Sequence, residues 1–492
     1  MFESCPNRPH YLRNILAPLF ALLLSACTVG PDYQTPVIQL ESSYAQQDST
    51  ASELKISEAD TQFWRHLGDS LLESLVDDTL RANHDIRIAL SRYEQARALT
   101  RQTGLDRYPT LHSTVDITDQ RSSASQAPHL SRTQRDGESH AASLSAIWEL
   151  DFFGRVHRSV ESQRADTEAS AADLAGVQVA MVAELTDAYF RWRGLQVRLQ
   201  VAHDNENNQA DTLRLINALF QNGRGTTLDT DRARTQLALT RSRMPIMEAE
   251  AAVTANRIAV LTGRAPAAII EVLRHSDAFP VLPVRINAGA PGELLRRRPD
   301  IAAAERRLAA ATARIGVATA DLFPRFTLGG LFGTQALGFS ALFERDSETR
   351  MISLGVSGSF LDVGRVRARI AAANSATAEN LAAYELTVLR AMEETENALV
   401  RLSRAQTEQT ILIQAAETSN STALTARLQF EGGMVSVLEV LDAERLRLQA
   451  QDLLTQSSTR QATALVAVYK TLAGGWPQLF PETTKDKSVA KW

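Results

Sequence analysis

Two short breaks in an otherwise helical sequence constrain the fold of this chain most strongly: residues 220–229 and residues 430–439. Each break contains two glycines close to a phenylalanine, and glycine can adopt the positive φ that ends a helix. The glycines are Gly223 and Gly225 in the first break, and Gly432 and Gly433 in the second. Each break is therefore predicted to be the turn at the tip of a helical hairpin.

A hydroxyl residue and an acidic residue follow the glycines in both breaks. Thr226 precedes Asp229 by three positions, and Ser436 precedes Glu439 by three positions. This is the spacing of a capping box, in which the hydroxyl and the carboxylate bond the free N–H groups where a helix begins. The two breaks match in kind and in order, which predicts that one long hairpin unit occurs twice in the chain.

Apolar residues before each break follow the spacing of a coiled-coil seam. No proline occurs from residue 155 to residue 244, and a continuous helix over residues 155–222 would be roughly 100 Å long. Return helices are expected over residues 228–261, kinked or broken at Pro245, and in the second half up to residue 472. The seams consist of Leu174, Val177, Met181, Leu185, Ala188, Trp192, Leu195 and Leu199, and of Leu381, Tyr384, Val388, Met392, Thr395, Leu399 and Leu402.

Four segments alternate polar and apolar side chains with a period of two, which is typical of half-buried β-strands. They cover residues 111–118, 143–152, 326–336 and 351–361. A half-polar strand is usual in a soluble sheet, but strands of about 10 residues joined by a long polar loop are also typical of outer-membrane hairpins. The alternation alone does not separate these two possibilities.

Further landmarks recur in the same order in both halves. Residues 69–107 are predicted to form a helix, interrupted at Asn83 and His84, which Pro109 stops as Pro324 stops the matching helix of the second half. Gly154 and Gly364 precede the long helices. We therefore predict a first repeat, a proline-containing linker, a second repeat and a polar C-terminal tail, with the bounds 69–263, 264–293, 294–477 and 478–492.

The N-terminus has the pattern of an exported lipoprotein. Residues 1–26 combine basic residues, a short apolar run and small residues before Cys27, as in a signal peptide with a lipobox. Cys27 would be acylated after cleavage, although an ordinary signal peptide followed by a chance cysteine would give the same pattern. Thr28 follows Cys27 where an aspartate would signal retention, which by the usual sorting pattern implies the outer membrane. Residues 27–68 are then predicted to form a lipidated, irregular arm.

The composition and the remaining motifs exclude several classes of function. A net charge of −5 gives no reason to expect a nucleic-acid partner. No segment after the N-terminal one has 18 or more consecutive apolar residues, so no transmembrane helix is expected. The histidines are scattered without the spacing of metal ligands, and the sequence has neither a nucleophile motif nor a phosphate-binding loop. We expect no enzymatic activity, no metal and no cofactor apart from the lipid on Cys27.

The predicted strands are too few to close a barrel within one chain. An open sheet edge cannot lie in lipid, so the adjoining strands must come from other copies of the chain. Two copies would give eight strands, whose side chains fill the interior, whereas three copies would give twelve strands and an open lumen. A homotrimer is thus the smallest assembly that makes a pore. A periplasmic coiled-coil lipoprotein without a pore is the alternative, and the strands argue against it.

Several motifs in the mature chain point to a known family. They are residues 27–33 with Pro36, residues 298–301 with Glu305, residues 323–324, the strand exit at residues 361–365, and the second tip at residues 438–443. Through them the chain resembles the TolC-like outer-membrane efflux ducts, in their lipoprotein (NodT/OprM-like) branch. The resemblance covers essentially all the mature chain. It implies a mainly α fold with membrane β-strands, in which a duplicated strand-hairpin and long-helix-hairpin unit builds a trimeric, twelve-stranded β-barrel continuous with an α-helical barrel.

The same resemblance implies a function. Such a duct is the outer-membrane channel of a tripartite efflux pump, and it is a passive exit for drugs or other toxic small molecules. It is anchored in the outer membrane of a Gram-negative bacterium and extends into the periplasm. Its partners would be a periplasmic adaptor (membrane fusion) protein and an inner-membrane RND-type pump. A duct for type I protein secretion is the alternative, and the acylated N-terminus favours small-molecule efflux.

The resemblance also implies a periplasmic gate at the tips, where acidic residues ring the entrance. The positions that match this gate, with the neighbouring leucines as a hydrophobic alternative, are Asp229, Glu439, Asp442, Leu438 and Leu441. Glu439 and Asp442 share one helix face because they are three residues apart, and in a trimer their carboxylates would attract cations.

Two features keep the details of this gate open. Glu439 can instead simply complete the capping box, whereas Asp442 lies outside the box. TolC has an arginine two residues after the tip glycine, where this chain has Val435, so that ionic latch is not carried over. Arg224, on the first tip, is a candidate substitute.

Overall fold

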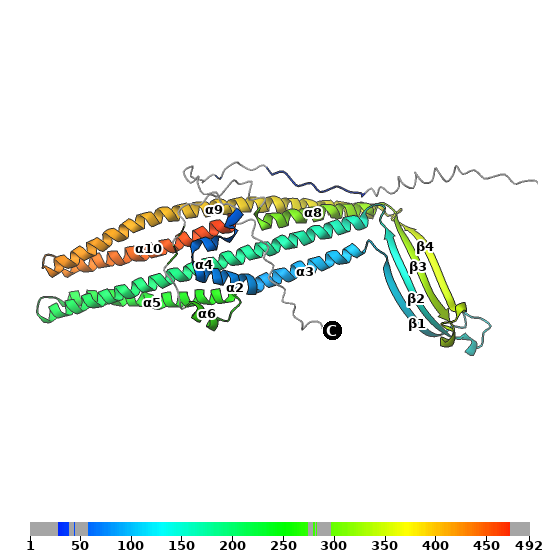
Figure 1. The fold of residues 1–492 in the computed structure, drawn as a ribbon, viewed down its shortest axis with the longest axis horizontal. Coiled ribbons are helices and arrows are strands. Elements are labelled where there is room, and N and C mark those ends of the chain that lie inside the picture. Colours follow the sequence, from blue (N-terminus) through cyan, green and yellow to red (C-terminus); the bar gives the residue numbers. More distant parts are fainter. Residues whose placement is uncertain are drawn as a thin grey trace, which may run out of the picture. The chain divides into compact units, whose positions relative to one another are not determined.

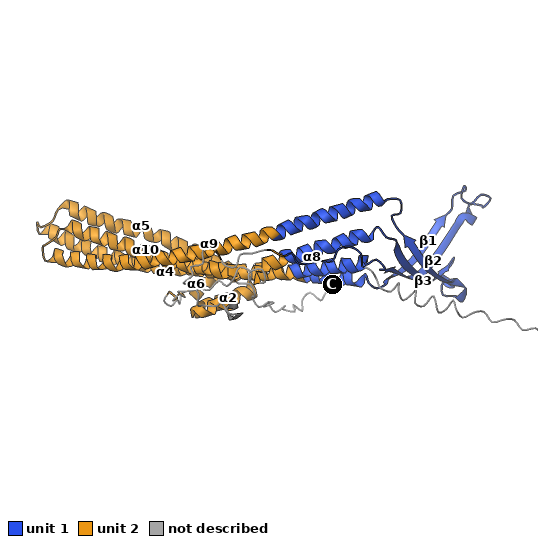
Figure 2. Ribbon diagram, turned by 90° about the horizontal axis from the view of Figure 1, so that it is seen from above, with its two compact units in different colours: residues 1–36, 94–169, 304–384 blue, residues 37–93, 170–303, 385–492 orange. Residues whose placement is uncertain are grey.

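The computed structural model describes residues 28–38, 44, 58–273, 279–280, 282 and 297–472. The predicted signal peptide, Cys27 and the C-terminal tail lie outside the described residues, as do parts of the arm and the linker. The chain divides into two compact units (Figure 2): unit 1 takes in residues 1–36, 94–169 and 304–384, and unit 2 takes in residues 37–93, 170–303 and 385–492. Each unit therefore contains parts of both predicted repeats.

The sheet of unit 1 has four antiparallel strands in the order β1-β2-β3-β4 (Figure 1). Each hairpin comes from one repeat, and β2 pairs with β3 to join the two hairpins. Short 3₁₀ turns lie in the hairpin loops, at Thr133–Arg135, Phe339–Ala341 and Arg345–Ser347. The strands are β1 (Thr110–Arg121), β2 (Asp136–Leu150), β3 (Arg325–Ala336) and β4 (Glu348–Ser357). The four predicted strands are confirmed.

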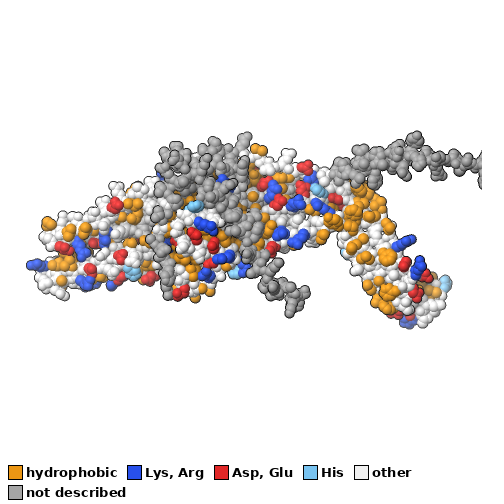
Figure 3. Space-filling model, in the orientation of Figure 1, with side chains coloured by type: hydrophobic (Ala, Val, Ile, Leu, Met, Phe, Trp, Pro, Cys, Tyr) orange, Lys and Arg blue, Asp and Glu red, His pale blue; other side chains and the backbone are white. Residues whose placement is uncertain are grey.

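The two faces of this sheet differ in polarity, as the period-two pattern predicts. The register places Leu111 opposite Ala146, which lies opposite Gly330, which lies opposite Ile352. The apolar side chains of this face are exposed in the single chain; Ile352 is 88% exposed. Figure 3 shows hydrophobic side chains gathered over the strands. An exposed apolar face of this kind indicates a surface that is covered by a membrane or by another protein chain.

Four helices contribute to both units, because the boundary between the units falls within each of them. Two of these helices are 67 and 69 residues long, in agreement with the proline-free runs of the sequence. The four helices are α3 (His84–Leu105), α4 (Arg155–Gln221), α8 (Pro299–Ala320) and α9 (Val363–Glu431).

Unit 2 holds the largest hydrophobic core of the described residues. Side chains from α4, α9 and α10 meet there with those of the shorter helices. Phe63 stacks on Tyr469 with ring centroids 4.4 Å apart, and the hydroxyl of Tyr189 donates to the Asp69 carboxylate at 2.6 Å. The remaining elements of this unit are the 3₁₀ segment η1 (Glu58–Leu67) and the helices α2 (Ser70–Ala82), α5 (Thr227–Leu261), α6 (Pro266–Leu273) and α10 (Val437–Leu472).

The predicted helix over residues 69–107 is interrupted at Asn83, where α2 ends and α3 begins. The Asn83 side-chain oxygen accepts the N–H groups of Asp85 and Ile86 at 2.8 and 3.1 Å, so it caps the start of α3. Its amide nitrogen donates to the carbonyl of Leu261 at 2.9 Å. The break thus ties the first helices of unit 2 to the end of α5.

The seam residues are buried or partly buried, as a coiled-coil seam requires, but the break at Pro245 and the end of the fourth strand need correction. Helix α5 continues through Pro245, so the predicted break does not occur, whereas the alternative of a kink at this proline stays a prediction. Strand β4 ends at Ser357 rather than at residue 361, because the chain turns there towards α9. Part of the expected linker is the helix α6, which packs its Ile269 into the core of unit 2. Among the described helices, none combines the length and the apolar character needed to cross a membrane.

Candidate gate at the helix tips

Both tips are built on a left-handed glycine. Gly223 and Gly433 have φ values of +71° and +74°. In the first tip, the Gly223 N–H bonds the Phe220 carbonyl at 3.0 Å and the next N–H reaches back to Leu219 at 2.8 Å. In the second tip, the Gly433 N–H bonds Phe430 at 2.9 Å, and the next N–H bonds residue 429 at 2.8 Å. This pair of backbone hydrogen bonds is the Schellman motif, which ends helices.

The other two tip glycines serve different purposes. Gly225 and Gly432 do not adopt a positive φ, so the expectation that Gly432 takes part in the left-handed turn is wrong. A Cβ on Gly225 would lie 3.2 Å from the backbone nitrogen of Phe220, so close approach of the chain favours glycine there. A Cβ on Gly432 would make only ordinary contacts, the nearest being with Met434 at 3.4 Å.

The two predicted capping boxes differ in completeness. In the first tip the Thr226 hydroxyl accepts the Asp229 N–H, and the Asp229 carboxylate accepts the Thr226 N–H at 3.1 Å, which is a complete box. In the second tip the Glu439 carboxylate accepts the Ser436 N–H at 3.1 Å. The Ser436 hydroxyl, however, accepts the N–H of Leu438 at 3.3 Å. Glu439 therefore acts as a capping residue at the start of α10 in the single chain.

The predicted gate carboxylates project from the tip of α10 beside its buried side. Val440 and Ala443 are buried, whereas Glu439 and Asp442 are exposed. Asp442 is paired with Arg445 of the same helix at 2.5 Å. The hydrogen bond from the Ser436 hydroxyl, with backbone N–H groups, holds the pKa of Glu439 below its usual range.

The remaining predicted gate residues make no hydrogen bond or ion pair with these two carboxylates within the described chain. Asp229 is engaged in its own capping box on α5. Leu438 is 51% exposed and Leu441 is partly buried. Arg224 is exposed and forms no ion pair with another described residue. The ring expected from these side chains thus requires more than one copy of the chain.

A largely buried ion pair on α10, close to the second tip, was not expected from the sequence. Glu444 is buried on α10 and pairs with Arg447 at 2.6 Å, and Arg447 also donates to the Asn205 side chain of α4 at 3.3 Å. These positions continue the buried stripe of Val440 and Ala443 by helical spacing. The sequence signal for this contact between the two long hairpins is that Glu444 and Arg447 are charged residues at positions where helical spacing predicts a buried side chain.

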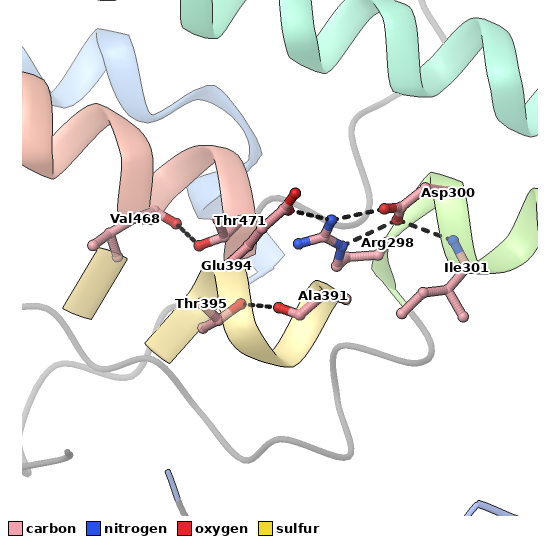
Figure 4. A network of polar contacts seen from close by, with 8 residues as sticks. All are labelled: Arg298, Asp300, Ile301, Ala391, Glu394, Thr395, Val468 and Thr471. Carbon is pink, nitrogen blue, oxygen red and sulfur yellow. Dashed lines mark hydrogen bonds and ion pairs between the residues drawn. The ribbon is translucent and has the colours of Figure 1, made fainter. Parts of the chain in front are cut away.

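The motif at residues 298–301 makes a second polar network, in unit 2 (Figure 4). The buried Arg298 guanidinium bonds both carboxylate oxygens of Asp300, at 3.0 and 2.7 Å, and it bonds Glu394 of α9 at 2.8 Å. Asp300 also accepts the Ile301 N–H at 2.9 Å at the start of α8. Burial disfavours the charged guanidinium, but the hydrogen bonds that Arg298 donates to Asp300 and Glu394 outweigh burial and raise the pKa of Arg298. The motif therefore fixes the start of α8 on α9.

Comparison with known proteins identifies the family of this fold. Residues 75–264 and 290–474 match the family described as "Outer membrane efflux protein". Pyoverdine export outer membrane protein OpmQ of Pseudomonas putida is 31% identical over 94% of this chain and 97% of that protein. Outer membrane protein OprJ of Pseudomonas aeruginosa is 31% identical over 94% of this chain and 96% of that protein.

Solved structures agree with the sequence relatives. The outer-membrane channel OprN is 38% identical, with a TM-score of 0.82 over 92% of this chain and 100% of that chain. A structure of CusC is 25% identical, with a TM-score of 0.79 over 91% of this chain and 100% of that chain. The predicted family and the predicted TolC-like fold are confirmed. The chain belongs to the outer membrane efflux protein family, in its NodT/OprM-type branch, and is an outer-membrane component of an efflux system.

Proposed function

We propose that this protein is the passive exit duct of a tripartite pump and that it works as a homotrimer. The observation that carries the proposal is the sheet of unit 1, whose edge strands β1 and β4 pair with no further strand among the described residues. Its apolar face is exposed as well. Three copies would pair these edges and supply twelve strands, enough for a barrel with an open lumen. Lipid would then cover the apolar face.

The partners and the substrates follow from the family. We propose a periplasmic adaptor protein and an inner-membrane RND-type pump as partners, and small molecules such as drugs or toxic compounds as substrates. The names of the relatives point to varied cargo: OpmQ is named for pyoverdine export and TtgI of Pseudomonas putida for toluene efflux. We further propose that residues 1–26 are removed and that Cys27 carries the lipid.

We propose that the tips of α5 and α10 form the closed periplasmic end of the duct. In a trimer, the exposed Glu439 and Asp442 would come together around the axis. Arg445 would offset part of the charge of Asp442, because the two form an ion pair in each chain. Removing the carboxylate and removing the guanidinium should therefore change ion selectivity in opposite directions.

The test is ion selectivity of the purified protein in planar bilayers. Asp442→Asn should lower the preference for cations, and Arg445→Gln should raise it, with folding intact in both. Glu439→Ala is the comparison for a capping role, since it should lower thermal stability whether or not Glu439 faces the pore. If selectivity is unchanged in both Asp442→Asn and Arg445→Gln, the constriction lies elsewhere, and Leu438 is then the next residue to change.

Two further measurements test the assembly and the anchor. A monodisperse monomer in mild detergent that conducts no ions in bilayers would refute the trimeric duct. Acyl labelling of the wild-type protein, lost in Cys27→Ser, would support the lipid anchor, and an unlabelled mature protein would refute it. Passage of polypeptide cargo rather than of small solutes would favour the protein-secretion alternative.

A further inference from the structure

The first described residues have no regular secondary structure, yet they are bound closely to the helices of unit 1. We call residues 28–35 the strap (at the start of the blue segment in Figure 1). The Val29 N–H bonds the carbonyl of Phe153 at 3.3 Å. A Cβ on Gly154, which has a φ of +75°, would lie 2.9 Å from the Cα of Thr28. The strap therefore begins against the residues that connect β2 to α4.

Two glycines allow the strap to lie directly on α8. Gly30 has a φ of +92°, and a Cβ there would overlap the Cα of Gly316. A Cβ on Gly316 would in turn lie 2.8 Å from the side chain of Arg158. A larger side chain at Gly30 would push the strap off α8, so the close approach of two backbones requires glycine there. A larger side chain at Gly316 would instead displace the Arg158 side chain, which itself contacts the strap.

Arg158 of α4 recognises the backbone of the strap. Its side chain is 4% exposed, and it donates to the carbonyls of Val29 and Gly30 at 3.3 and 3.4 Å. It also bonds the Asp32 carboxylate at 2.6 Å. A buried guanidinium needs its donors satisfied, and here the strap supplies three of the acceptors while Glu161 supplies another at 2.8 Å.

Tyr33 fills the groove between the two helices. Its ring packs on a cluster of small side chains, namely Ala165 of α4 and Ala309 and Ala310 of α8. Its hydroxyl donates to Glu305 at 2.8 Å, and the Arg306 guanidinium lies 5.6 Å from its ring centre. Burial raises the pKa of Tyr33, and the hydrogen bond to Glu305 raises it further. The aromatic side chain thus touches helices from both repeats.

We propose that the groove between α4 and α8 is a binding site for an extended peptide, and that residues 28–35 of the same chain occupy it. The bound strap joins a helix of the first repeat to a helix of the second. The strap begins at residue 28, directly after the proposed lipid-bearing residue in the sequence. Resting on the proposed acylation of Cys27, binding of the strap would limit how far the anchor can move from the helices of unit 1.

The test uses the full chain with one nitroxide label at the exposed Gln34→Cys. Cys5 and Cys27 are both replaced by serine, so that the introduced cysteine is the only labelling site and no lipid holds the strap. The label should give a slow-motion spectrum, because the groove itself binds the strap. Arg158→Gln and Gly316→Leu should each shift the spectrum to fast motion. A label that is already mobile without these changes would overturn the proposal.

Two controls separate loss of the strap from loss of the fold. Arg314→Gln removes an ion pair between α8 and α4, with Asp166, and Arg314 is not among the hydrogen-bond partners described for the strap, so the change should leave the label immobile. Gly30→Leu changes only the strap, and it should release the label while the melting temperature of the helical body is kept. If Arg158→Gln and Gly30→Leu both leave the label immobile, the groove does not hold the strap.

The outcome is independent of the lipid. Failure of acyl labelling in the wild-type chain would reject the anchor on Cys27 and would leave the peptide site standing. Conversely, a label that is immobile only in chains that retain an acylated Cys27 would show that the lipid holds the strap, which would reject the peptide site.

Discussion

The second tip offers a matched pair of substitutions, Gly433→Ala and Gly432→Ala, for which the structure predicts opposite effects. Gly433 has a φ of +74° and no atom within 4 Å of where a Cβ would lie, so the cost of alanine is purely conformational, about 1–2 kcal/mol. Gly432 does not have a positive φ, and its nearest contact would be at 3.4 Å. Alanine there should stabilise by about 0.4–1 kcal/mol, because it restricts the unfolded chain.

The two variants should therefore differ by about 2 kcal/mol, which is roughly 30-fold in the opening equilibrium of the tip. Hydrogen exchange of the amides of residues 433 and 434, whose N–H groups make the two closing bonds, measures this equilibrium directly. Gly223→Ala on the first tip should behave like Gly433→Ala, since its φ is +71°. Equal acceleration of exchange in Gly432→Ala and Gly433→Ala would refute the assignment of the left-handed residue.

Three further outcomes are expected. Asn83→Ala should lower the free energy of unfolding by about 2–4 kcal/mol in urea titrations, because it removes a helix cap and leaves the buried carbonyl of Leu261 unpaired. Gly194→Ala should destabilise by about 1–3 kcal/mol in the same assay, since the new Cβ would lie 3.0 Å from the Thr459 Cβ across α4 and α10, and Thr459→Ala should restore part of the loss. Burial alone would raise the pKa of Glu305, but the hydrogen bonds it accepts outweigh burial and lower it. The contribution of Glu305 to strap binding should therefore persist where an ordinary glutamate takes up a proton, and it should weaken as pH falls through the lowered pKa; the mobility of the nitroxide label measures this change.

Much of the fold was predictable because it is encoded by local periodicity. The period of two gave the four strands, although β4 ends four residues before its predicted end because chain direction after Gly358 depends on contacts and not on alternation. At Pro245 the sequence left a kink and a break open, and α5 continues through the proline without a break, with Met244 and Met247 beside it buried. The sequence predicts only that the first helix is interrupted at Asn83. In the structure the Asn83 side chain caps the start of α3 and donates a hydrogen bond to the end of α5.

The sequence by itself determined the repeats, the long helices and the two turns, because glycine conformation, capping and side-chain period act between residues close together in the chain. It could not determine how charged side chains pair. Arg445 offsets Asp442 within one helix, and Arg298 meets Glu394 from far along the chain. Binding of the strap could not be predicted from the sequence either. Arg158 binds the strap partly through backbone carbonyl oxygens. Every residue carries such an oxygen, so only the tertiary structure shows which of them Arg158 contacts.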